Sequence, residues 1–212
     1  MSIGRGMSEL QLDALRELMN IGFGQAAAAL SEIVDLRVGL SVPKVLVLSP
    51  EKIASFIETE MGEPSSFSVV EQFFFGRFEG TCFLLLPEDE GRKLAALFGA
   101  EASALPPDLE LGSLELDTVV EVGNIIIGAC VGKIAEMLKD QVTFQAPRFL
   151  ASSLERDAIA KRFAGRKNSA LVFKTVFRFE RQDVFGFLFL VVSEGSFSWM
   201  KKAVDEYLGS LS

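Results

Sequence analysis

The spacing of hydrophobic and polar residues predicts the same series of elements in both halves of the chain. Hydrophobic residues that recur at helical spacing indicate helices, and hydrophobic runs bounded by turn residues indicate strands. In the first half the pattern predicts a helix at residues 12–33, a strand around Pro43 and a second helix at 49–61. A hairpin of strands 68–78 and 80–86 follows, and then a helix at 87–99. The second half repeats the series, with a helix at residues 116–137, a strand around Pro147 and a helix at 154–163. Its hairpin consists of strands 169–180 and 184–192, and its last helix is at 193–209.

An internal repeat explains this agreement. Leu, Asp, Glu, Asn and Ile of LDALRELMNIGFGQAAAALSEI, which begins at Leu12, recur 104 residues later in LDTVVEVGNIIIGACVGKIAEM. Each segment is followed at the same distance by a proline inside a predicted strand. We therefore expect one domain made of two homologous halves, about 8–99 and 112–210, joined by a linker with two prolines at 100–113.

The phenylalanines bear on the fold class. The chain has 19 of them, many in the two predicted hairpins, and the faces of such a sheet need cover. The predicted helices and the strands of the other half can supply it. We expect an α/β (α+β) fold with pseudo-twofold symmetry, one shared β-sheet, and the two helices that carry the repeated motif exposed to solvent.

The repeated polar residues share one face of each predicted helix. At about 100° per residue, Glu17 lies about 40° from Asp13, and Asn20 lies about 20° from it on the other side. Hydrophobic residues occupy the opposite side, at Leu15, Leu18, Met19, Phe23 and Leu30. In the second copy Asp117, Glu121 and Asn124 share a face, and Val119, Val122 and Ile126 lie opposite.

A solvated helix face would by itself account for the aspartates and glutamates. The asparagines need another reason, because Asn within a helix costs roughly 0.5 kcal/mol relative to Ala. Neither Asn20 nor Asn124 lies where a helix cap would use it, since hydrophobic residues continue the helix after both. We therefore interpret the two trios as candidate functional sites.

Composition narrows the classes of function. The formal net charge of −8 argues against nucleic acid as the main partner. The absence of histidine removes Ser-His-Asp and Cys-His triads and nearly all catalytic zinc sites. No hydrophobic run approaches the roughly 20 residues that cross a bilayer, and the N-terminus lacks a secretory signal, so we expect a cytoplasmic protein without membrane insertion. Cys82 and Cys130 are expected to be buried, reduced thiols.

The trio suits one kind of chemistry. A carboxamide can hold a water molecule by donating and accepting hydrogen bonds, and a carboxylate can pair with a cation on a partner. Such a site is half an active site, which a partner completes by bringing the substrate. Hydrolysis of an acyl phosphate fits, because catalysis of phosphoryl transfer consists mostly of positioning and charge stabilisation.

The motif resembles the signature of the CheC/CheX/FliY phosphatases of bacterial and archaeal chemotaxis. That signature is Asp or Ser, three residues, Glu, two residues, Asn, and then Pro after 22 further residues. The positions that match it are Asp13, Glu17, Asn20 and Pro43 in the first copy, and Asp117, Glu121, Asn124 and Pro147 in the second. Two copies and a length of 212 residues favour a CheC-like protein over CheX, which is shorter. FliY-like proteins add a C-terminal flagellar-switch domain, so with Ser212 as the last residue of the sequence we expect a protein that resembles CheC more than FliY.

The resemblance implies a specific activity, which is dephosphorylation of the phospho-aspartate of a CheY-type response regulator. Glu17 and Glu121 would pair with a lysine of the regulator, and Asn20 and Asn124 would orient the attacking water. Asp13 and Asp117 would support the helix or the contact, and Pro43 and Pro147 would shape the neighbouring strand. The regulator would supply Mg²⁺, so this chain would need no cofactor or metal of its own. Family members also bind the deamidase CheD.

Two alternatives remain open. A non-catalytic adaptor would bind a regulator, CheD or a flagellar switch protein without hydrolysis, and a free-standing hydrolase would act on a small phosphoester. Turnover of the phosphorylated regulator separates the first from a phosphatase, and a chromogenic phosphate tests the second. Gln25 and the isoleucines 125–127 depart from the family pattern and could unbalance the two sites. Glycines 22, 24, 123 and 128 serve either close helix packing or a docking partner.

Overall fold

The computed structural model describes residues 6–35, 37–49, 52, 55, 56, 59, 67–97, 113–150, 168–179 and 183–210. The helices of this part are α1 (Glu9–Val34), α3 (Glu88–Leu97), α4 (Ser113–Met137) and α6 (Glu194–Ser210). The strands are β1 (Val38–Leu48), β2 (Phe67–Phe75), β3 (Gly80–Pro87), β4 (Thr143–Phe144), β5 (Arg148–Phe149), β6 (Asn168–Phe179) and β7 (Asp183–Ser193).

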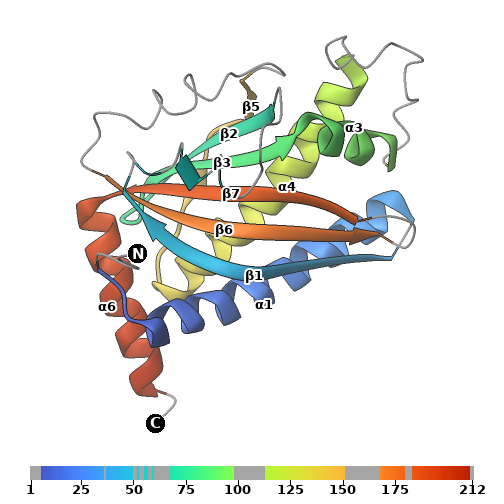
Figure 1. Cartoon of the computed structure of the whole chain (residues 1–212). Coiled ribbons are helices and arrows are strands. Elements are labelled where there is room, and N and C mark those ends of the chain that lie inside the picture. Colours follow the sequence, from blue (N-terminus) through green and yellow to red (C-terminus); the bar gives the residue numbers. More distant parts are fainter. Residues whose placement is uncertain are drawn as a thin grey trace.

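The described strands form one antiparallel sheet that both halves of the chain share (Figure 1). Its order is β1-β6-β7-β3-β2-β4, and β5 also pairs with β2. The centre joins the two hairpins through β3 and β7, where Leu84 lies opposite Leu188. Outside them the strands cross over between the halves: β1 pairs with β6, whereas β4 and β5 pair with β2. Each hairpin is therefore extended by strands from the other half.

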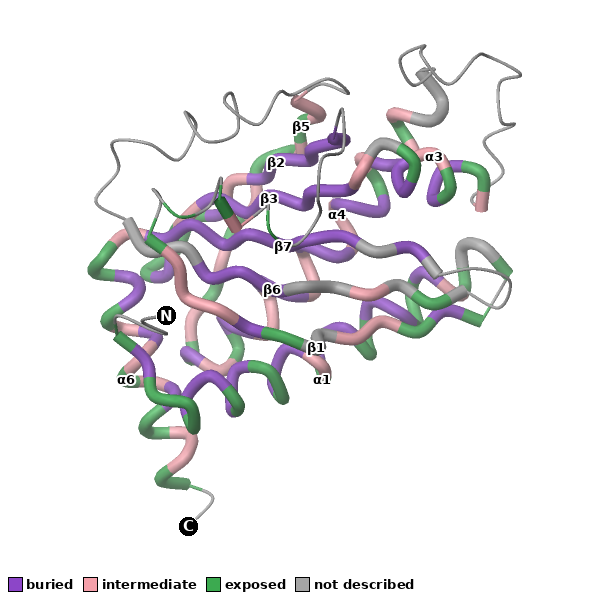
Figure 2. Tube along the Cα trace, viewed as in Figure 1, coloured by how far each residue is buried: buried purple, intermediate pink, exposed green. Residues whose placement is uncertain are grey.

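Helices α1 and α4 pack on one face of this sheet and against each other, while α3 and α6 lie towards opposite ends (Figure 1). The main core fills the space between them and includes Met19 and Phe23 of α1, Ile126 of α4 and Phe173 of β6, all fully buried. The central strands β3 and β7 are buried along most of their length (Figure 2). The alternation of buried and exposed positions along α1 shows that only one side of this helix enters the core.

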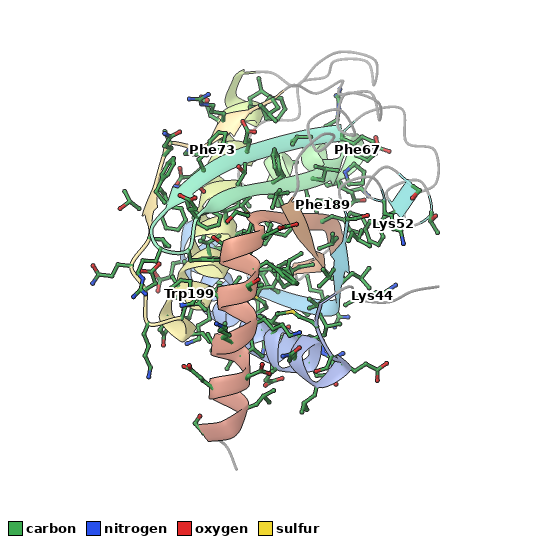
Figure 3. All side chains as sticks on the ribbon, turned by 90° about the vertical axis from the view of Figure 1, so that its left-hand side faces the viewer. Lys44, Lys52, Phe67, Phe73, Phe189 and Trp199 are labelled. Carbon is green, nitrogen blue, oxygen red and sulfur yellow. The ribbon has the colours of Figure 1, made fainter. Side chains whose placement is uncertain are left out.

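The opposite face of the sheet carries a second hydrophobic cluster. It is built mainly from Phe67, Phe83, Phe187 and Phe189, of which Figure 3 labels Phe67 and Phe189. The ring of Phe56 meets Phe187 and Phe189 edge-on, with centroid distances of 5.7 and 6.3 Å. Edge-to-face contacts of this kind are favourable beyond the area that they bury. The phenylalanines thus fill cores on both faces of the sheet.

Most predicted elements are confirmed, with one correction and some small shifts. Pro43 lies in β1 as predicted, at the irregularity between Ser41 and Lys44, where a missing N–H is tolerated. The prediction of a strand around Pro147 is wrong, because Pro147 lies between the two-residue strands β4 and β5. Proline has no N–H group to donate to a hydrogen bond between strands. Pro87 ends β3 rather than starting α3. The helices predicted at 49–61 and 154–163 and the linker fall mostly outside the described residues.

Helix α4 is more apolar than the short runs of its sequence suggested. Within the described residues, Leu116–Met137 is the one stretch long and apolar enough to cross a membrane by length and composition, with a mean hydropathy of 1.6. Half of this stretch is buried inside the fold. A core helix of a folded domain passes the same test, and α4 packs on α1, α3 and the sheet as such a helix does.

Candidate functional site

Helix α1 begins one turn before the first trio, at a capping box. The Ser8 hydroxyl accepts a hydrogen bond from the Gln11 N–H at 3.2 Å, and the Gln11 side-chain oxygen accepts one from the Ser8 N–H at 2.8 Å. This exchange satisfies two of the N–H groups that a helix start leaves unpaired. The Gln11 amide also donates to Asp205 of α6, which ties the two helices together. Asp13 therefore lies one turn after a helix start that the capping box stabilises.

The structure places the motif residues of both helices on the outer side, as the periodicity predicted. Asp13 and Glu17 of α1 are exposed, as are Asp117 and Glu121 of α4. The residues between them that face the sheet are buried, namely Leu15, Leu18, Met19, Phe23, Val119, Val122 and Ile126. Asn20 and Asn124 differ from the carboxylates because both are half-buried. The asparagines thus stand at the border between the core and the solvent.

The surroundings of the two aspartates differ. Asp13 forms an ion pair with Arg16 one turn along α1, with 2.9 Å between the Arg16 Nη2 and Asp13 Oδ1 atoms. Both side chains are largely exposed, so the pair contributes little to stability. The residue of α4 that corresponds to Arg16 is Val120, which cannot form such a pair. The two exposed faces therefore carry different charge patterns around the same motif.

Asn124 is held from the sheet by a residue that the sequence patterns did not single out. Gln72 of β2 donates from Nε2 to the Asn124 Oδ1 at 2.9 Å and to the Gln145 carbonyl at 3.1 Å. Gln72 is only 2% exposed. Its signal in the sequence is the polar pair Glu71–Gln72 inside the hydrophobic strand SVVEQFFF. A buried carboxamide in such a strand needs partners, and one of them is the motif asparagine.

Close packing accounts for two of the four glycines near the motifs. A Cβ on Gly22 would lie 2.9 Å from the Lys133 Cβ and 3.2 Å from the Ala129 carbonyl, where α1 meets α4. One on Gly123 would lie 2.9 Å from Val70 of β2, so this glycine lets α4 approach the sheet beside Asn124. Gly24 and Gly128 have nothing within 4 Å of an added Cβ. Packing does not explain these two.

Neither a metal-ligand cluster nor a reactive cysteine accompanies the motif residues in the described part of the chain. In the part of the chain that the structure describes, no three His, Cys, Asp or Glu side chains lie together as metal ligands would. Cys82 and Cys130 are buried in the core, and burial raises the pKa of both thiols. Raised pKa values make them poor nucleophiles at neutral pH. The chemistry of the described surface near the motifs rests on carboxylates and carboxamides.

Comparison with known proteins identifies relatives of the chain. Residues 10–47, which contain the whole first motif copy, match the CheC-like family. The CheY-P phosphatase CheC of Bacillus subtilis is 28% identical over 154 residues, which cover 69% of this chain and 69% of that protein. The flagellar motor switch phosphatase FliY of the same organism is 26% identical over 143 residues. That match covers 67% of this chain but 36% of FliY, so the chain spans about a third of that relative.

Solved structures agree on the fold. FliY of Thermotoga maritima superposes with a TM-score of 0.74 at 19% identity, covering 95% of this chain and 98% of that one. The FliM middle domain of H. pylori has a TM-score of 0.62 at 12% identity, covering 93% and 99%. At such identities the likeness concerns the fold alone. These similarities confirm the resemblance seen in the motifs: the chain is similar in sequence to CheC and FliY, and its fold is similar to those of FliY and the FliM middle domain.

Proposed function

We propose that this chain is a phosphatase that hydrolyses the phospho-aspartate of a CheY-type response regulator. The observation that carries this proposal is the presence of two Asp/Glu/Asn trios on the outer faces of α1 and α4. The carboxylates are accessible to a partner, and each asparagine is half-buried beside them. The relatives CheC and FliY are both named as phosphatases, which supports the same chemistry here.

Each trio would work as half of an active site. The exposed Glu17 or Glu121 would accept a charge-assisted hydrogen bond from a lysine of the regulator and so dock it. Asn20 or Asn124 would hold a water in line with the acyl phosphate by hydrogen bonds from and to its carboxamide. The water oxygen forms a bond to phosphorus while the bond from phosphorus to the aspartyl oxygen breaks. The aspartate carboxylate is regenerated, and inorganic phosphate leaves as dihydrogen phosphate, which carries both protons of the water. Mg²⁺ belongs to the regulator in this scheme.

The other motif residues would support this geometry. Asp13 and Asp117 would contribute to docking from one turn before the glutamates. Pro43 and Pro147 would shape the chain beside β6 and β2, where the sheet meets the motif helices. We place the protein in the cytoplasm, where response regulators act, with CheD as a further candidate partner.

Decay of a ³²P-labelled, phosphorylated CheY-type regulator with Mg²⁺ tests the proposal. The wild-type chain should speed the decay, Asn20→Ala and Asn124→Ala should each retain part of the effect, and the double variant should lose it. Glu32→Gln, an exposed residue of α1 outside the motif, is the matched control and should retain full activity. Unchanged decay with wild-type protein, even with CheD present, would contradict the proposal.

A non-catalytic adaptor is the second candidate, because the FliM middle domain has a similar fold. An adaptor would bind the phosphorylated regulator or a switch protein without shortening the lifetime of the phosphoryl group. Measuring binding and decay on the same samples separates the two functions. Binding that survives the double asparagine substitution, without acceleration of decay by wild-type protein, favours the adaptor.

A further inference from the structure

We propose that Gln72 is a positioning residue that fixes the orientation of the Asn124 carboxamide at the second site before a partner arrives. This role rests on the phosphatase function proposed above. Gln72 is buried in β2, out of reach of a docking protein, so it would act only through Asn124. Three steps lead from the backbone of the sheet to the exposed site.

The first step is the orientation of Gln72, which a backbone carbonyl determines. A carbonyl oxygen can only accept hydrogen bonds, so the Gln72 atom 3.1 Å from the Gln145 oxygen must be the NH₂ nitrogen. The Gln145 residue is itself fixed, because its N–H donates to the Phe73 carbonyl of β2 at 3.0 Å. The sheet thus decides which way the Gln72 amide faces.

The second step passes this orientation to the motif. The same Gln72 nitrogen lies 2.9 Å from the Asn124 side chain, and only the Asn124 Oδ1 can accept from it. The Oδ1 of Asn124 is therefore turned towards the buried glutamine, and its NH₂ group lies on the other side of the carboxamide carbon. One lone pair of Oδ1 remains for a water, and within the described residues no acceptor engages the two N–H donors, which can therefore serve a partner.

The arrangement has a cost, which argues against a purely structural role. The Gln72 Oε1 atom is buried and has no hydrogen-bond partner among the described residues. Burying an amide oxygen without a partner is unfavourable, and an apolar residue would avoid it. In the second hairpin the equivalent position holds such a residue.

The third step is this difference between the halves. Helices α3 and α6 follow directly on β3 and β7, beginning at Glu88 and Glu194, so Cys82 of β3 corresponds to Leu188 of β7. Gln72 pairs with Cys82, and Phe173 pairs with Leu188. Phe173 is fully buried and has no hydrogen-bonding group in its side chain. Phe173 therefore cannot take the role in the second hairpin that Gln72 takes in the first, and the positioning by Gln72 is specific to Asn124. A side chain fixed in advance loses less entropy when the complex forms.

The near-isosteric Gln72→Met substitution tests the inference in two backgrounds. In an Asn20→Ala chain, which relies on the second site, it should lower kcat for decay of the phosphorylated regulator about tenfold with a smaller change in KM. In an Asn124→Ala chain, which relies on the first site, it should add no comparable loss. Equal losses in both backgrounds would show general damage to the fold and would overturn the positioning role.

A spectroscopic measurement keeps this inference separate from the phosphatase proposal. The side-chain ¹⁵N–¹H₂ signal of Asn124, assigned by its loss in Asn124→Ala, should shift in Gln72→Met, whereas that of Asn20 should not. An unchanged Asn124 signal overturns the positioning role whatever the enzymatic result. A shifted signal in a protein without phosphatase activity leaves the positioning role standing and removes the proposed function.

Discussion

At the scale of single residues, the two kinds of motif side chain have different surroundings. Glu17 and Glu121 are exposed, so water solvates their carboxylates when a partner is absent. When a partner binds, the same carboxylates can form a charged contact with it. Asn20 and Asn124 are half-buried, and the Oδ1 atom of Asn124 accepts a hydrogen bond from Gln72. The glutamates are thus suited to docking and the asparagines to holding a defined geometry.

Substituting both glutamates by glutamine should separate docking from stability. Exposed positions of this kind change the free energy of unfolding by about 0.5 kcal/mol or less, so thermal unfolding of Glu17→Gln with Glu121→Gln should resemble wild type. Loss of a hydrogen bond to a charged group, about 1.5–3 kcal/mol, should weaken turnover of the regulator by about tenfold or more. Calorimetry and the decay assay check the two parts. A large fall in unfolding temperature would show that the glutamates serve the fold instead.

The buried thiols predict a loss of stability at alkaline pH. Burial raises the pKa of Cys82 and Cys130 above the ordinary thiol value of 9.0, so the folded chain holds these protons longer than the unfolded chain. Their contribution to stability is complete below pH 9.0 and declines as pH rises beyond it, by up to about 1.4 kcal/mol per pH unit for each thiol. Urea unfolding between pH 7 and 10 measures this decline, which should be shallower in Cys82→Ala. Equal slopes in the two proteins would contradict it.

At the scale of elements, the periodicity of hydrophobic residues was sufficient to predict the long helices but not the short strands. α1 and α4 could be predicted because hydrophobic residues that enter the core recur at helical spacing over more than six turns. The region around Pro147 could not, because β4 and β5 are two residues each and form only through pairing with β2. The same holds for Gln72: its partner Asn124 is 52 residues away, and no local pattern shows their contact.

Two glycines of α1 should respond in opposite ways to alanine. In Gly22→Ala the new Cβ would crowd Lys133 and Ala129 of α4, which should destabilise the fold by about 1–3 kcal/mol. In Gly24→Ala the new Cβ has no neighbour within 4 Å, and the better helix former should stabilise the fold by up to about 1 kcal/mol. Chemical denaturation of both variants gives the comparison. If Gly24→Ala is more stable yet less active, room for a docking partner explains this glycine.

At the scale of the whole molecule, the sheet makes each half depend on the other. β1 of the first half pairs with β6, and β4 and β5 of the second half pair with β2. We propose that the chain arose by duplication of one unit, and the exchange of edge strands is the arrangement that two copies of such a unit would adopt in a dimer. Neither half retains a complete set of strand neighbours when alone.

Cutting the chain in the predicted linker should therefore prevent either half from folding. Fragments 1–105 and 106–212 would each present unpaired strand edges and an uncovered core, so we expect poorly dispersed NMR spectra from each alone. Mixing or co-expressing the fragments should restore the dispersed spectrum and cooperative unfolding. A single fragment that unfolds cooperatively as a monomer would show that the halves are independent domains.

The exchange of strands between the halves also bears on how the two sites can evolve. In a dimer of identical subunits every substitution enters both sites, so an improvement to one site that harms the other cannot be separated from its cost. A single chain removes this constraint, and each site becomes a separate target of selection. Gln72 in the first hairpin and Phe173 at the equivalent position of the second are a difference that such independence permits, because a glutamine that suits one site need not appear at the other.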